Sequence, residues 1–137
     1  MGKTIDAFVI DPDHGVLRVE VASDGSSIAP FINSVVDGWF DAVHPTFEHA
    51  SGPLNIVGYV HDEGLLLGLK PNIIASALFG RVLVGRCVVV GTLNTLGNYD
   101  GESHDVPSGA IEVMAWLDQA FAIWKDNDVE WDGPSDD

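Results

Sequence analysis

The segment Arg81-Val-Leu-Val-Gly-Arg-Cys-Val-Val-Val-Gly-Thr-Leu93 is the part of the chain richest in valine. Because β-branched side chains favour extended backbone, we predict a strand here. Around Cys87–Val90, apolar residues occupy both alternating positions, and this pattern is typical of a strand buried on both faces. We therefore expect this strand to lie at the centre of a sheet.

Three further segments are predicted to be strands. Thr4–Ile10 is β-branched and aromatic, Val16–Val21 alternates between apolar and charged residues, and Leu54–Val60 is apolar. Between the first two lies Asp11–Gly15, which combines Pro, Asp and Gly, the residues of tight turns. The first two strands are therefore expected to form a hairpin.

Three segments are predicted to be helices: Ile28–Val43, Ile73–Phe79 and about Ala110–Lys125. In the first, apolar residues fall at steps of three and four, as in an amphipathic helix, and Pro45 ends it. In the second, Asn72 is placed to cap the beginning and Gly80 to cap the end. The segment Asn94–His104, which precedes the third helix, is predicted to be a polar loop.

The predicted order along the chain is therefore β-β-α-β-α-β-α. This order favours a small α+β domain with a mixed or antiparallel sheet, and we expect the helices to pack on one face of it. Residues 1–125 are expected to form a single domain, since the whole chain of 137 residues has the length of one domain. Residues 126–137 hold six acidic residues and no basic ones, which predicts an acidic C-terminal tail.

The charge of the chain restricts its partners. The sequence has 21 acidic and 6 basic residues, giving a formal charge of −15. Direct binding to nucleic acid or to an anionic membrane needs Lys and Arg to neutralise phosphates, so neither partner is expected. The chain shows no signal peptide and no apolar stretch long enough to span a bilayer, and a cytoplasmic location is predicted.

Surface carboxylates are the most abundant candidates for a functional site. Asp37 and Asp41 are four residues apart on the first predicted helix, and Glu112 and Asp118 lie on the third. Carboxylates ordered in this way can imitate DNA phosphates and occupy the nucleic-acid site of another protein, while the alternative is that they only keep the chain soluble. Trp131, in the acidic tail, either docks on its own domain or anchors a partner.

Motifs of catalysis and of metal or phosphate binding are absent from the sequence. It contains no GxSxG, HExxH or GxxxxGK[ST] pattern, and Cys87, the single cysteine, is expected to be a buried thiol with a raised pKa. No catalytic residue, metal ligand or cofactor is therefore predicted. The alternative is a pocket between the sheet and the first helix, lined by Trp39, Tyr59, His61 and Asn72.

Three of the few basic residues lie close together along the chain: Lys70, Arg81 and Arg86. One interpretation is a small site for an anion within a negative surface. Because carboxylates are in excess, we favour the interpretation that these side chains pair with carboxylates of their own domain.

One region resembles a known family. Its motif runs through Gly64-Leu-Leu-Leu-Gly-Leu-Lys-Pro-Asn72, Ala75-Ser-Ala-Leu-Phe-Gly80, Leu83-Val-Gly85 and Val88-Val-Val-Gly91. In this pattern the chain resembles a family of small uncharacterised proteins carried by actinobacterial phages and mobile elements. The earlier segment Val36-Asp-Gly-Trp-Phe-Asp-Ala-Val43 also resembles a segment of the family. Asp37 stands where the family pattern has a glycine, and Lys70 where it has a leucine. The resemblance covers about Thr4–Val90 and implies an origin and a fold rather than an activity.

These observations together predict a non-enzymatic, phage-type accessory protein that binds a host or phage protein, in defence evasion or host takeover. The expected partner is a protein with a basic surface, and a phage-encoded protein of this kind would act in the bacterial host's cytoplasm. Two alternatives stay open: a DNA-mimic inhibitor of a nucleic-acid-binding enzyme, and a small ligand-binding or enzymatic domain with the pocket named above. The oligomeric state also stays open.

Overall fold

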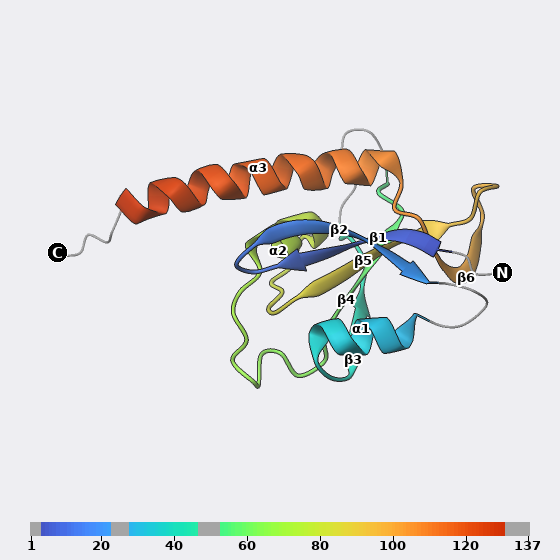
Figure 1. The fold of residues 1–137 in the computed structure, drawn as a ribbon, viewed down its shortest axis with the longest axis horizontal. Coiled ribbons are helices and arrows are strands. Elements are labelled where there is room, and N and C mark those ends of the chain that lie inside the picture. The colour runs from blue at the N-terminus through green and yellow to red at the C-terminus, as the bar shows by residue number, and fades with distance from the viewer. Residues whose placement is uncertain (1–3, 23–27, 47–52, 131–137) are drawn as a thin grey trace.

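The structure, a computed structural model, describes residues 4–22, 28–46 and 53–130 (Figure 1). Over these ranges the strands are β1 (Thr4–Asp11), β2 (Gly15–Ala22), β3 (Phe40–Val43), β4 (Ile56–His61), β5 (Cys87–Leu93) and β6 (Tyr99–His104). The helices are α1 (Ala29–Val36), α2 (Ile73–Phe79) and α3 (Ser108–Glu130). All strand pairs are antiparallel, which confirms the predicted α+β class and antiparallel sheet.

The sheet is built around β5, as the valine-rich segment predicts. Its strand order is β2-β1-β5-β4-β3, and β6 also pairs with β5. On one side of β5, Cys87–Val89 pairs with β1, and on the other side Val88–Gly91 pairs with β4. β1 and β2 form the expected hairpin, and β2 and β3 are the edge strands at the two ends of this order.

The helices lie on both faces of the sheet, which corrects the prediction of one covered face. Along β5, Cys87 and Val89 belong to a buried cluster with α2 and α3, while Val88 and Val90 belong to a cluster with α1. Figure 1 shows α1 on one side of the sheet and α3 on the other. The physical reason is the apolar surface of β5, since each uncovered face would lose about 25 cal/mol per Å² of apolar burial.

The first predicted helix is only half as long as expected. α1 ends at Val36, and Asp37, its C-cap, has a left-handed backbone with φ 66°. The N–H groups of Asp37 and Gly38 both donate to the Asn33 carbonyl, and Asn33 Nδ2 donates to the Gly38 carbonyl at 2.7 Å. These bonds turn the chain sharply, and Phe40–Val43 then pairs with β4 as β3.

Two differences concern strands. The predicted central strand begins only at Cys87, because Gly85 has φ 76° and Val84 forms an isolated bridge with Pro71. The predicted polar loop contains β6, which pairs with β5 through Gly91 and Leu93. A strand can form there because pairing uses backbone groups and does not need an apolar side-chain pattern.

The third helix is longer than predicted. α3 continues to Glu130, five residues past the predicted end of the domain at 125, so the acidic segment 126–137 begins inside the helix. Ala110, Met114 and Phe121 of α3 are buried in the core. Residues 131–137, including Trp131, lie outside the described residues.

The second helix is held in place by Asn72, whose side chain is buried. Its Oδ1 caps α2 by accepting from the Ala75 N–H at 3.0 Å, as the sequence predicts. Its Nδ2 donates to the carbonyls of Ile10 and Gly85, both at 2.8 Å. Asn72 therefore joins α2, β1 and the segment before β5 at one point.

Two carboxylates at the turn between β1 and β2 form ion pairs with basic side chains. Lys70 pairs with Asp13, and Arg86 Nε lies 2.9 Å from Asp11 Oδ2. This confirms internal pairing for two of the three basic residues discussed above. Arg81, the third, forms no ion pair with any residue in the described ranges.

Asp11 is expected to make the stability of the protein depend on acidic pH. Burial by itself raises the pKa of Asp11, but hydrogen bonds from Arg86 and from the backbone of Asp13 and His14 outweigh it and lower the pKa to about 2. Because ionised Asp11 favours the folded state, its contribution is present above pH 4 and is lost as the pH falls towards 2. Urea unfolding should show Asp11→Asn less stable than wild type at pH 6, with the difference shrinking towards pH 2. A difference independent of pH would contradict this account.

Candidate protein-binding site

The outer side of β3 is an open sheet edge. The Asp62 N–H donates to the Trp39 carbonyl at 3.1 Å, and hydrogen-bonded pairs alternate along antiparallel strands. The N–H and C=O groups of Phe40 and Ala42 therefore point away from β4. Within the described ranges no strand pairs with them, and such an edge is a template for an added strand.

A groove of about 530 Å³ lies beside this edge. We call it the β3 groove; its walls are β3, the end of β4, the turn after β4 through Leu66, and residues 81–84. Three of its aliphatic side chains are strongly exposed: Leu65 at 75%, Leu66 at 86% and Val82 at 75%. Clustered exposed apolar side chains of this kind mark interaction surfaces.

The turn that presents the two leucines is fixed by its own backbone. The Leu67 N–H donates to the Glu63 carbonyl at 2.9 Å, and the Leu69 N–H donates to the Gly64 carbonyl at 3.0 Å. Gly64 packs so closely on Val84 that a Cβ there would lie 2.8 Å from Val84 Cγ2. Leu65 and Leu66 are therefore exposed on a turn whose backbone is fixed.

The rim of the β3 groove is acidic. Asp41, Asp62 and Glu63 line it together with Arg81, so carboxylates outnumber the cation. Asp62 lies 3.6 Å from His61 Nδ1, a nitrogen that also accepts from the Glu63 N–H at 2.9 Å. The arrangement of apolar walls and an acidic rim suits a partner that is both apolar and basic.

Comparison with known proteins places this groove inside a family domain. Residues 5–105 match the model of a family described as Domain of unknown function (DUF3846). The chain belongs to the DUF3846 family. The match spans β1 to β6 and ends before α3, so the residues of the β3 groove lie within the match and α3 lies outside it. No curated protein and no solved structure is significantly similar to this chain.

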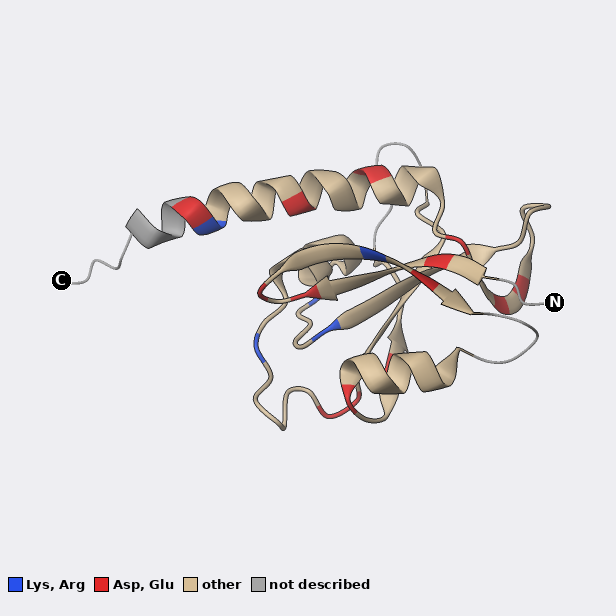
Figure 2. Cartoon of the chain, viewed as in Figure 1, with Lys and Arg blue, Asp and Glu red and all other residues tan. Residues whose placement is uncertain are grey.

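The acidic candidates of this DUF3846 protein are dispersed. Asp37 is the C-cap of α1, on one face of the sheet. Asp41 lies two residues before Val43 in β3 and therefore on the same face as Val43, which is buried with α2 on the other side of the sheet. Asp118 is engaged, because its Oδ1 accepts from the Val16 N–H at 3.1 Å, and Glu112 is exposed on α3. Figure 2 shows acidic residues scattered over both sides of the molecule. The two predicted pairs do not form one band, and only Asp41 belongs to the β3 groove.

The four residues predicted to line a pocket do not converge, which corrects that prediction. Trp39 is 77% exposed, because α1 ends before it. Tyr59 packs edge-on against Phe40, with ring centroids 5.3 Å apart, and Asn72 is buried in its hydrogen-bond network on the other face. Only His61 lines the β3 groove, and its Nε2 lies so close to Gly38 that a Cβ there would be 2.6 Å away.

The sequence contained one signal for the β3 groove. Three leucines, Leu65–Leu67, stand between Gly64 and Gly68, outside every predicted helix and strand. An apolar triplet in a turn has no face of a helix or strand to bury it, so its exposure can be anticipated. The contribution of Val82 could not, since residues 81–86 were expected to belong to a strand.

Other site chemistry can be described briefly. Burial raises the pKa of the Cys87 thiol to about 12, which confirms its predicted character. Among the described residues, no three His, Cys, Asp or Glu side chains gather as metal ligands would. In the same residues, no helix is long and apolar enough to cross a membrane.

Proposed function

We propose that this DUF3846 protein is a non-enzymatic accessory protein that binds a host or phage protein through the β3 groove. The observation that carries the proposal is the set of exposed side chains Leu65, Leu66 and Val82 beside the edge of β3, which no strand of the described ranges pairs with. The partner supplies an extended segment in which apolar side chains alternate with Lys or Arg.

Strand addition explains why both features occur together. The open N–H and C=O groups of β3 give affinity to any extended backbone, and the groove beside them selects the side chains. Asp41, Asp62 and Glu63 at the rim favour Lys and Arg in the added segment. The chain's charge of −15 accelerates the approach of a basic partner at low salt.

The phage context of the proposal rests on the sequence resemblance described above. A small, acidic protein that captures a segment of another protein suits defence evasion or host takeover inside a bacterial host. The β3 groove supplies such a protein with a binding site that needs no cofactor and no catalytic residue.

Selection from a library of random displayed peptides tests the proposal. Selected at low salt on the full chain, the enriched peptides should alternate apolar residues with Lys or Arg, and added salt should weaken them. The double variant Leu65→Asp, Leu66→Asp should bind them about tenfold more weakly or worse, because it removes apolar contacts and adds charge beside them.

A matched control is Leu96→Asp, which also adds a charge at a strongly exposed leucine but lies outside the β3 groove. This variant should bind the same peptides as wild type does. Equal losses in both variants, or enriched peptides without basic residues, would overturn the proposal.

A further inference from the structure

α3 has an apolar surface wider than its own domain covers. Its first apolar row packs on the domain and comprises Ala110, Met114, Leu117 and Phe121. A second row steps by three, four and three residues along the neighbouring side of the helix and comprises Val113, Trp116, Ala120 and Ile123. In this second row Trp116 is 66% exposed and Ile123 is 63% exposed. Val113 of this second row is itself packed against the core, so the apolar surface left to explain is that of Trp116 and Ile123.

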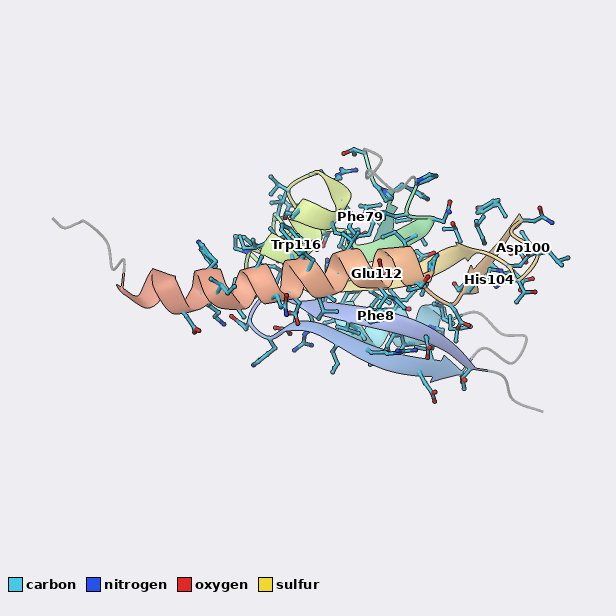
Figure 3. The ribbon with its side chains drawn as sticks, turned by 90° about the horizontal axis from the view of Figure 1, so that it is seen from above. Phe8, Phe79, Asp100, His104, Glu112 and Trp116 are labelled. Carbon is cyan, nitrogen blue, oxygen red and sulfur yellow. The ribbon has the colours of Figure 1, made fainter. Side chains whose placement is uncertain are left out.

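The rotation of α3 is fixed, so Trp116 and Ile123 cannot turn towards the core. Lys125 Nζ donates to the Asp13 carbonyl at 2.7 Å, and Asp118 Oδ1 accepts from the Val16 N–H. Both contacts join α3 to the β1–β2 hairpin. Figure 1 shows the C-terminal end of α3 reaching beyond the sheet, and Figure 3 shows Trp116 on the side of α3 next to α2.

The spacing of the second row indicates what covers it. Apolar side chains at steps of three and four pack into the grooves of another helix. Tryptophan in such a position is the side chain most often found to dominate binding energy. The occupant that fits is therefore a helix with an apolar stripe.

The charge of α3 restricts the identity of that helix. Its 23 residues include five acidic ones and a single lysine. Lys125 is already engaged, since its Nζ also lies 5.5 Å from the Phe121 ring centroid. A second copy of the chain would bring an equal charge of −15, and like charges oppose its approach. A helix from a different, basic protein has the complementary charge.

We infer that α3 carries a second docking surface, which binds a basic amphipathic α-helix of another protein. The apolar stripe of that helix packs on Trp116 and Ile123, and its Lys or Arg side chains lie against Glu112 and Asp126, both exposed on α3. The inference does not depend on the β3 groove. α3 lies outside the residues 5–105 that match the DUF3846 family model.

Two designed helical peptides of about 18 residues test the inference. One has leucine at the a and d positions of each heptad and lysine elsewhere, and the other has glutamate in place of every lysine. Calorimetry with the full chain should show binding of the lysine peptide only. Ile123→Asp and Trp116→Ala should each weaken that binding about tenfold.

A control variant distinguishes binding at the α3 surface from a general effect of added charge and from binding at the β3 groove. Leu66→Asp places the same new charge at another exposed aliphatic residue and should bind the lysine peptide as wild type does. Equal affinity of wild type and Ile123→Asp would overturn the inference, and so would a loss confined to Leu66→Asp. Sedimentation showing a dimer that Ile123→Asp dissociates would also overturn it, by making a second copy the occupant.

Discussion

Replacing Asn72 with alanine is expected to lower the free energy of unfolding by about 4 kcal/mol. The side chain is 1% exposed, and its amide satisfies the carbonyls of Ile10 and Gly85 and the N–H of Ala75. The truncation leaves these three groups without that partner, and each unsatisfied buried group costs about 1–3 kcal/mol. The loss of the cap on α2 is included in this cost.

Urea unfolding measures the change, with Asn98→Ala as the control because Asn98 is exposed. The control should stay within about 0.5 kcal/mol of wild type. Asn72→Asp keeps the oxygen that caps α2 but removes both donors, so it should also be strongly destabilised. Wild-type stability in Asn72→Asp would show that the bonds to Ile10 and Gly85 contribute little.

Asn72 also shows what the sequence can and cannot predict. Its role as a cap is local, since the bond to Ala75 spans three residues, and α2 was predicted with the bounds that it has. Its bond to Ile10 spans 62 residues and depends on how β1 meets the segment before β5. No pattern in the sequence encodes that meeting, so the buried network could only be found in the structure.

Two predictions about the helices were wrong: that they cover one face of the sheet, and that the first helix continues to Val43. A central strand with two apolar faces already implies cover on both sides, so the two-sided arrangement could have been inferred from Cys87–Val90. The length of α1 could not, because Phe40 and Val43 continue the helical spacing of three and four, although in the structure they lie on opposite faces of β3. The turn that separates them from α1 depends on a left-handed Asp37, a conformation that few residues other than glycine adopt.

The candidate site was less predictable than the fold. Of the acidic residues singled out from the sequence, Asp41 alone lines the β3 groove, and it does so from a strand rather than from a helix. The exposure of Leu65 and Leu66 could be anticipated from their place outside a helix or strand, but their meeting with Val82 beside β3 depends on the folded sheet, and no sequence pattern contains it. The unpaired edge of β3 is likewise a property of the sheet order.

Gly91→Ala is expected to destabilise the protein by about 3 kcal/mol, at the upper end of the usual cost of overpacking. A Cβ at Gly91 would lie 2.0 Å from the carbonyl oxygen of Asp105 and 3.2 Å from that of His104. Both atoms are backbone, so no side-chain rotation relieves the contact. Asp105 cannot move away freely, because its Oδ1 accepts from the Asp6 N–H at 2.7 Å and the next N–H, of Val106, donates to the Asp6 carbonyl.

Gly109→Ala is the matched control, because a Cβ there meets nothing within 4 Å and the residue lies in α3. Alanine favours a helix over glycine by up to about 1 kcal/mol, so the two glycine substitutions should change the midpoint of thermal unfolding in opposite directions. A Gly91→Ala midpoint at or above that of wild type would contradict the close approach of β5 to Asp105. Because Gly91 lies outside the β3 groove, the folded fraction of Gly91→Ala should still bind the selected peptides, which separates loss of the fold from loss of the site.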